Sequence, residues 1–290
     1  RFVDYVVLIV KGMAMGAADV IPGVSGGTIA FISGIYEELI ESIHKVNGQA
    51  AKKLFKEGIP AFWTHINGNF LSSVLLGIAI SILSLARLIT FLLENHPIPV
   101  WAFFFGLIVG SVYFVAKKIR RWNAGVIIAG IIGIVVAYFI TVTVPAETPE
   151  ALWFIFISGF IAICAMILPG ISGSFILLLL GKYQYVLEAL KEFRVDVIGV
   201  FIVGCAIGII SFAQIINWLF KHFHDLTVAL LAGFMVGSLN KVWPWKETLE
   251  YYEKDGEMLP LVEQSVLPHT FEEVTGNDPQ ILLAVTVALA

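Results

Sequence analysis

Two short polar runs interrupt otherwise apolar stretches of the sequence, and both follow the pattern Pro-Gly-x-Ser-Gly. Proline lacks a backbone N–H and glycine tolerates strained dihedral angles, so neither run can continue a helix through hydrocarbon without exposing unpaired peptide groups. Unwound backbone at membrane depth is tolerated where it lines a polar cavity. We therefore predict that the runs form the two halves of one substrate-binding site. Its candidate residues are Pro22, Gly23, Ser25, Gly26, Gly27 and Thr28 in the first run and Pro169, Gly170, Ser172, Gly173 and Ser174 in the second.

The residue types in these runs favour the binding of an anion. A helix that restarts after each run presents free N–H groups and about half a positive charge at its first turn. Glycine allows close approach of a ligand, and the serine and threonine hydroxyls add donors. The helix that ends at each run presents carbonyl oxygens at the same depth, so a cation held beside Asp19 is an alternative. A purely structural helix break is another.

Four charged residues are candidates for coupling or charge compensation. Asp19 is ionisable at membrane depth, where such residues mark functional sites, but its carboxylate can equally cap the following helix. Met166 occupies the equivalent position of the second run. Arg87 either pairs with Asp19 or a substrate phosphate, or extends to the membrane interface. Glu41 and Glu188 match across the halves but lie about three turns beyond the runs, which favours solvated helix ends over a site.

The composition is that of a polytopic membrane protein. Of 290 residues, 58% are hydrophobic and 14% are charged, and the mean hydropathy is +0.89. Soluble domains contain about 45–50% apolar residues, and a transmembrane helix needs about 20 of them in succession. Cys164 and Cys205 lie in apolar segments without metal-ligand neighbours, so we expect neither a metal site nor a disulfide. No cofactor and no nucleic-acid partner is expected.

The sequence contains an internal repeat. The proline of the second run follows that of the first by 147 residues, and the same offset relates Gly34 to Gly181. Beyond the first connector the offset is 127, as between Gly77 and Gly204. We predict an all-α fold of two repeats, residues 1–145 and 146–290, each a re-entrant helical hairpin followed by three transmembrane helices. The hairpins are expected at 2–40 and 151–190 and the spans at 70–93, 100–116, 122–144, 197–220, 226–242 and 279–290, the last being truncated.

The distribution of positive charge predicts the orientation of the repeats. A hairpin adds no net crossing, so three spans place the second repeat upside down relative to the first. Lysine and arginine gather in the connector 42–68, in 117–121 and in the turn at Lys221, which all fall on one side. By the positive-inside rule this side is cytoplasmic. The outer side then receives the connector 243–278, which carries nine Asp or Glu residues. Inverted repeats whose broken helices meet near the midplane are typical of transporters.

Residues 16–28, together with the second copy of the motif, resemble the polyprenyl-phosphate transporter family (PopT-type) of bacteria and archaea over nearly the whole chain. The resemblance implies a flippase that returns undecaprenyl phosphate, the lipid carrier of cell-wall synthesis, from the outer to the inner leaflet of the cytoplasmic (inner) membrane of a prokaryote. A substrate with a phosphomonoester head and an isoprenoid tail suits an anion site that is open to lipid. A proton or a sodium ion is the candidate coupling ion.

Two other functions compete with a lipid-phosphate flippase. A small-anion channel or ion-coupled transporter would use the same opposed helix N-termini. An intramembrane phosphatase acting on a lipid pyrophosphate would need a convergent base or nucleophile with several Arg or Lys donors, whereas the runs supply hydroxyls and one carboxylate. We therefore predict a transporter rather than an enzyme.

Overall fold

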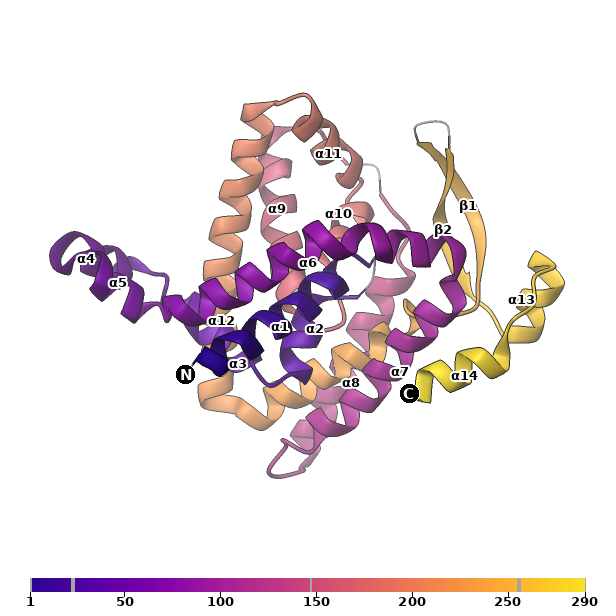
Figure 1. The fold of residues 1–290 in the computed structure, drawn as a ribbon, viewed down its shortest axis with the longest axis horizontal. Coiled ribbons are helices and arrows are strands. Elements are labelled where there is room, and N and C mark those ends of the chain that lie inside the picture. Colours follow the sequence, from indigo (N-terminus) through magenta and orange to yellow (C-terminus); the bar gives the residue numbers. More distant parts are fainter. Residues whose placement is uncertain (1, 22–23, 147, 255–256, 290) are drawn as a thin grey trace.

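Helices form most of the molecule, and several of them are long and apolar, as the hydropathy of the sequence predicts (Figure 1). The computed structural model describes residues 2–21, 24–146, 148–254 and 257–289, and 78% of the chain is helical. Within these residues, four helices are long and apolar enough to cross a membrane. They are α6 (Gly68–Asn95), α7 (Pro97–Ala116), α8 (Ala124–Val142) and α12 (Val195–Gly237). The chain is a multi-pass membrane protein.

Each predicted hairpin consists of three short helices. In the first half they are α1 (Phe2–Asp19), α2 (Gly26–Ile32) and α3 (Tyr36–His44), and in the second half α9 (Leu152–Ile167), α10 (Gly173–Leu179) and α11 (Tyr183–Lys191). The first break in each series falls at a Pro-Gly-x-Ser-Gly run, as predicted, although Pro22 and Gly23 themselves lie outside the described residues. The second break falls at Gly34 and Gly181, whose φ angles of +76° and +62° favour glycine.

Glycines let the first helix of each half pack directly against a long helix. A Cβ atom on any of them would clash with a backbone carbonyl of the partner helix, so α1 and α6, and likewise α9 and α12, lie in close contact. The facing pairs are Gly12 with Val74 and Gly77 with Ile9 in the first half, and Gly159 with Phe201 and Gly204 with Phe156 in the second. Every residue of the second set follows its counterpart by one of the two sequence offsets.

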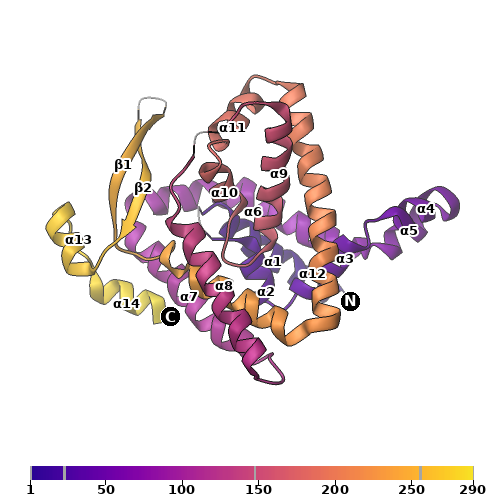
Figure 2. The ribbon, with the colours of Figure 1, turned by 180° about the vertical axis from the view of Figure 1, so that it is seen from behind.

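The last helix of each half packs against the other half. Helix α8 lies along the final part of α12, where Gly233 faces the Gly130 carbonyl. Helix α14 (Ile281–Leu289) lies along α7, where Gly106 faces the Ala288 carbonyl. Gly106 and Gly233 also correspond by sequence offset. The two halves therefore exchange their last helices in the same way (Figures 1 and 2).

Helix α12 contains two predicted spans. We expected the spans 197–220 and 226–242 to be separated by a turn, and the non-helical backbone of Phe223 (φ −138°, ψ 49°) divides α12 into two helical parts at this point. The kink is held from outside the helix, because the Asp225 carboxylate accepts hydrogen bonds from the backbone N–H groups of Arg120 (3.2 Å) and Arg121 (3.0 Å). The predicted turn between the two spans is therefore present as a sharp break at Phe223.

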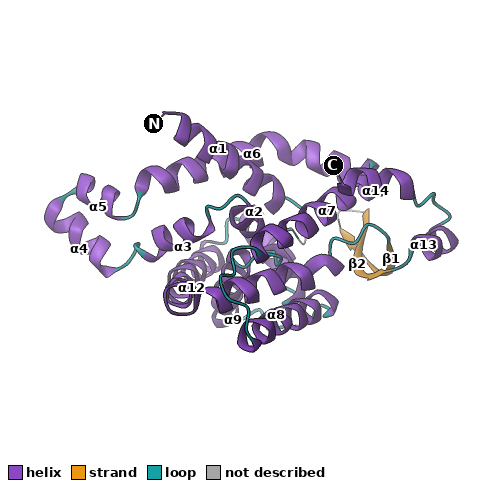
Figure 3. Ribbon diagram, turned by 90° about the horizontal axis from the view of Figure 1, so that it is seen from below, coloured by secondary structure: helices purple, strands orange, loops and turns teal. Residues whose placement is uncertain are grey.

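The two polar connectors contain regular structure that we did not predict. The first forms an arm of α4 (Gly48–Glu57) and α5 (Ile59–His65), which projects from the helical body. The second contains the antiparallel strands β1 (Lys246–Lys254) and β2 (Glu257–Ser265), followed by α13 (Pro268–Thr275). Figure 3 shows the strands at one edge of the molecule. The prediction of an all-α chain is therefore wrong for this segment.

Candidate functional site

The two Pro-Gly-x-Ser-Gly runs meet inside the structure. We call residues 18–21 and 24–28 the first tip and residues 166–174 the second tip. Ser25, which is fully buried, directs its hydroxyl at the second tip, where it lies 3.0 Å from the Met166 carbonyl oxygen and 3.3 Å from that of Leu168. In the other direction, the Gly170 N–H donates to the Thr28 hydroxyl at 2.8 Å. The predicted meeting of the two runs is thus present as direct hydrogen bonds.

Each tip also caps the short helix that follows it. The Ser25 side chain accepts a hydrogen bond from the Gly27 N–H (3.1 Å), and the Ser172 side chain accepts one from the Phe175 N–H (3.2 Å). The Ser174 hydroxyl lies 3.2 Å from that of Ser172. Serine at this position satisfies helix N–H groups that have no partner inside the helix. The hydroxyls therefore act at the starts of α2 and α10, where the sequence placed them.

Glycine is required at three close contacts that the tips make with one another or with their neighbours. A Cβ atom on Gly27 would lie 2.5 Å from the Ile167 carbonyl oxygen, and one on Gly173 would lie 2.8 Å from the Ala162 carbonyl oxygen. Gly170 adopts a φ of +93°, and a Cβ there would lie 2.6 Å from the Ser238 hydroxyl. The start of α2 consequently sits on the carbonyl end of α9, and the positive end of one helix faces the negative end of the other.

Asp19 binds the first turn of α2. Its Oδ1 accepts a hydrogen bond from the Gly26 N–H at 2.6 Å, and the side chain is partly buried. A carboxylate at a helix N-terminus is favoured by the partial positive charge there and by the N–H groups that lack helical partners. Of the two roles considered for Asp19, capping of the following helix is the one that this contact provides. The carboxylate also occupies the position at which a bound anion would meet the first N–H of α2.

The remaining charged candidates lie outside this contact. Arg87 is exposed on α6, which agrees with extension of its side chain to an interface. Glu41 is exposed on α3 and forms an ion pair with Lys45 at 3.0 Å. The hydrogen bond from Lys45 lowers the pKa of the Glu41 carboxyl. Glu188 is exposed on α11. The glutamates thus lie on solvent-accessible parts of the third helices.

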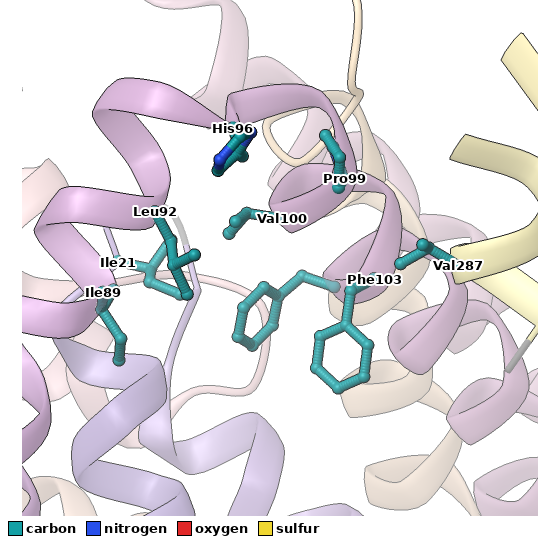
Figure 4. A pocket seen from close by; sticks show the side chains of 9 residues that line it. Ile21, Ile89, Leu92, His96, Pro99, Val100, Phe103 and Val287 are labelled. Carbon is teal, nitrogen blue, oxygen red and sulfur yellow. The ribbon is translucent and has the colours of Figure 1, made fainter. Parts of the chain in front are cut away.

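An apolar cavity of about 470 Å³ adjoins the first tip. It opens between the end of α6, the start of α7 and helix α14, and Figure 4 shows its side chains converging on one space. Ile21 of the first tip contributes to its wall, and His96 is the one polar side chain among the described lining residues. The lining residues are Ile21, Ile89, Leu92, His96, Pro99, Val100, Phe103, Phe104 and Val287. The chemistry of this cavity suits a hydrocarbon chain rather than an ion.

A sequence profile places the chain among known proteins. Residues 15–259, which include both tips, match the VCA0040-like family, described as undecaprenyl phosphate translocase-like. The chain belongs to this family. No solved structure shows significant similarity to it.

Two curated bacterial relatives carry the same name. A polyprenyl-phosphate transporter of Vibrio cholerae is 48% identical over 291 residues, covering 100% of this chain and 94% of that protein. A polyprenyl-phosphate transporter of Staphylococcus aureus is 36% identical over 256 residues, covering 81% of this chain and 85% of that protein. Both relatives are named as transporters rather than enzymes, in agreement with the prediction. The family resemblance inferred from the Pro-Gly-x-Ser-Gly runs is confirmed.

The sequence did not reveal the residues of the apolar cavity. They come from the first tip, from the consecutive helices α6 and α7 and from the distant helix α14, and all except His96 are ordinary apolar residues. The one usable signal was His96 beside Pro97 and Pro99, a polar and proline-rich break between two long spans. We had interpreted that break only as a turn.

Proposed function

We propose that this chain transports polyprenyl phosphate, returning undecaprenyl phosphate from the outer to the inner leaflet of the cytoplasmic membrane. The observation that carries this proposal is the hydrogen-bonded contact between the two tips, which brings unwound backbone from both halves together. Unwound backbone in the interior of a transporter is typical of a substrate site. The names of the two relatives support polyprenyl phosphate as the substrate class.

The two halves act as inverted repeats, residues 1–145 and 146–290, each with a re-entrant hairpin. The matched glycine contacts and the exchange of α8 and α14 between the halves support this arrangement. An exchange of equivalent elements is what a two-fold relation between the repeats would produce. The lysine-rich connector 42–68 faces the cytoplasm and the acidic connector 243–278 faces outward. One tip is then reached from each side of the membrane.

The phosphate headgroup binds by replacing contacts that the tips make with each other. The Ser25 hydroxyl donates to backbone carbonyls of the second tip, and the Gly26 N–H donates to the Asp19 carboxylate. A phosphomonoester offers three strong acceptor oxygens, so it can accept from the same donors and leave none of them unpaired. The tips separate to admit the headgroup and close again when it leaves, which provides alternating access.

Asp19 links headgroup binding to an ion. Its carboxylate and the phosphate compete for the same N-terminal turn of α2, and two anions in one low-dielectric site repel each other strongly. Binding of a proton or a sodium ion by Asp19 removes this repulsion. This step gives the coupling ion a defined task, namely to release the start of α2 for the substrate.

The isoprenoid tail occupies the apolar cavity beside the first tip. A cavity with one polar side chain in its wall matches a hydrocarbon tail better than a hydrated anion, which argues against a small-anion channel. The wall reaches Ile21, so a tail held there leaves the headgroup at the tips. We expect the rest of a long tail to extend into the lipid.

Transport by the purified chain in lipid vesicles tests this function. A fluorescent polyprenyl phosphate is added to the outer leaflet, and its protection from a membrane-impermeant phosphatase is followed over time. We expect protein-dependent protection without release of phosphate from protected lipid. Protein-dependent chloride or phosphate flux without lipid movement would instead identify a small-anion transporter. Hydrolysis of a lipid pyrophosphate by the chain alone would identify an enzyme.

Filling the apolar cavity should reduce transport of long-tailed substrates selectively. Val100→Trp places a large ring among the lining residues, and exclusion of two or three methylene groups of the tail lowers the transport efficiency roughly 10- to 50-fold. The control is Val109→Trp on the same helix. The Val109 side chain is 45% exposed, so this variant should transport normally. Competition between long-tailed and short-tailed phosphates in vesicles measures the effect. An equal loss of transport for long-tailed and short-tailed phosphates would show that the cavity does not bind the tail.

A further inference from the structure

Two lysines share one carboxylate oxygen where α12 leads into the β-hairpin. The Nζ of Lys241 lies 3.4 Å and the Nζ of Lys246 lies 3.6 Å from Oε2 of Glu263. We call these three side chains the lysine clamp. Lys246 begins β1 and Glu263 lies on β2, so the pairing of the strands fixes the geometry. The clamp carries two positive charges and one negative charge, an excess that a second anionic group can neutralise.

The ammonium group of Lys246 is largely buried, and removing a charge from water costs free energy. The side chain is 9% exposed, and its Nζ lies 4.0 Å from the centre of the Trp101 ring. Among the described residues, no group accepts a hydrogen bond from this Nζ. Burial lowers the pKa of Lys246 to about 8, and the attraction of Glu263 only partly offsets the effect. The Glu263 carboxylate at 3.6 Å attracts this buried cation from beyond close hydrogen-bond distance, and an anion that approaches more closely would stabilise it further.

The clamp adjoins the second tip. A Cβ atom on Gly170 would meet the Ser238 hydroxyl at 2.6 Å, so the short helix η1 (Ser238–Asn240) lies against the tip. Lys241 follows this helix directly, and its Nζ lies 4.8 Å from the centre of the Phe175 ring on α10. The Ser265 hydroxyl donates to the Asn240 carbonyl at 3.0 Å and ties the end of β2 to the same place. The clamp and the second tip are therefore neighbours.

Three tryptophan side chains lie close to the clamp. The Trp243 and Trp245 rings contact each other with their centres 5.4 Å apart, and each indole N–H donates to a backbone carbonyl at 2.8 Å. Trp101 lies in the first turns of α7. Tryptophan is enriched at the boundary between hydrocarbon and headgroups, which favours a position of the clamp near that boundary.

We propose that the lysine clamp captures the phosphomonoester headgroup of the lipid on the outer face and passes it to the second tip. This inference rests on the proposed transport function and assigns residues to its first step. A phosphomonoester carries a charge of about −1.5 to −2 near neutral pH and three acceptor oxygens, which is more than the single carboxylate of Glu263 supplies. Glu263 occupies the site until the headgroup displaces it, and its side chain is 26% exposed, so it can move toward solvent.

The clamp is a positively charged position beside a connector that is otherwise mostly acidic. The connector 243–278 carries nine Asp or Glu residues and, as basic residues, Lys246 and Lys254 only. An acidic surface repels anionic headgroups, so a local excess of positive charge beside the second tip directs them there. Although burial raises the pKa of Glu263, the ammonium groups of Lys246 and Lys241 hold it below its ordinary value. The carboxylate therefore stays charged and keeps both lysines in position.

Binding of farnesyl phosphate to the full chain in detergent micelles tests the clamp, with farnesol and inorganic phosphate as comparison ligands. We expect Lys241→Met and Lys246→Met each to weaken farnesyl phosphate binding roughly 10- to 100-fold, because each removes a charged hydrogen-bond donor. Glu263→Gln should strengthen binding, since it removes the competing carboxylate. Lys52→Met, an exposed lysine on α4, is the matched control and should bind normally. Calorimetric titration measures the affinities, and thermal melting checks that each variant is folded.

The outcomes separate the clamp from the transport function. Normal binding by both folded lysine variants would overturn the clamp and leave the proposed function in place. Equal, lysine-dependent affinity for inorganic phosphate would assign the site to free phosphate and would overturn capture of a lipid. If the unmodified chain binds no farnesyl phosphate, both proposals are wrong. If a lysine variant unfolds, Glu263→Gln decides alone, because tighter binding supports the clamp and unchanged binding contradicts it.

Discussion

Asp19→Ala and Asp19→Asn should both abolish transport of polyprenyl phosphate, but only the alanine variant should lose stability. The Asp19 carboxylate accepts a 2.6 Å hydrogen bond from the Gly26 N–H at the start of α2. Alanine leaves this donor unpaired, which costs about 1–3 kcal/mol of stability. Asparagine keeps an acceptor oxygen and the cap but removes the charge that binds a coupling ion. Transport in vesicles and thermal unfolding of the same preparations separate the two effects.

The matched control for Asp19 is Glu57→Gln. Glu57 is an exposed carboxylate at the end of α4, and its neutralisation should change neither transport nor stability. Wild-type transport by Asp19→Asn would reduce Asp19 to a helix cap and remove it from ion coupling. Loss of transport by Asp19→Asn at unchanged stability is the result that a structural cap alone does not produce.

Much of the helical framework could be predicted from the sequence, because apolar length and helix-breaking residues act locally. The starts of α2 and α10 follow from Ser25 and Ser172, which cap helices wherever a chain resumes one. The contact between the tips followed from the repeat and the count of spans. Its chemistry could not be predicted, since the Ser25 hydroxyl binds backbone carbonyls 141 and 143 residues away, and no local pattern selects those partners.

The two connections predicted around α12 fared differently. The turn expected at 221–225 is present as the kink at Phe223, and backbone donors in a distant loop hold Asp225 beside it. The β-hairpin had one signal in the sequence, because the Asp255-Gly256 dipeptide is typical of hairpin turns, although the flanking segments contain few β-forming residues. We interpreted the segment by its acidic charge alone. The charge of a connector indicates on which side of the membrane it lies, whereas its turn residues and the alternation of its side chains indicate its secondary structure.

Gly27→Ala should nearly abolish transport while the rest of the fold persists. The added Cβ would lie 2.5 Å from the Ile167 carbonyl oxygen and 3.0 Å from that of Met166. Both clashing atoms belong to backbone, so no side-chain rotation relieves the contact and the tips must separate. Ser25 then loses its partners across the interface. Because alanine favours helix over glycine by about 1 kcal/mol, any loss of stability comes from the clash and not from helix propensity.

The control is Gly110→Ala on α7, where an added Cβ meets no atom within 4 Å. This variant should transport normally and melt at or slightly above the wild-type temperature. If the tips must close once in every transport cycle, Gly27→Ala lowers the rate at least about 100-fold, because a block of 2.7 kcal/mol or more corresponds to that factor. A wild-type rate for Gly27→Ala would mean that the tips never close on one another during transport. The headgroup would then have to bind elsewhere along the path, and the lysine clamp would become the main site for it.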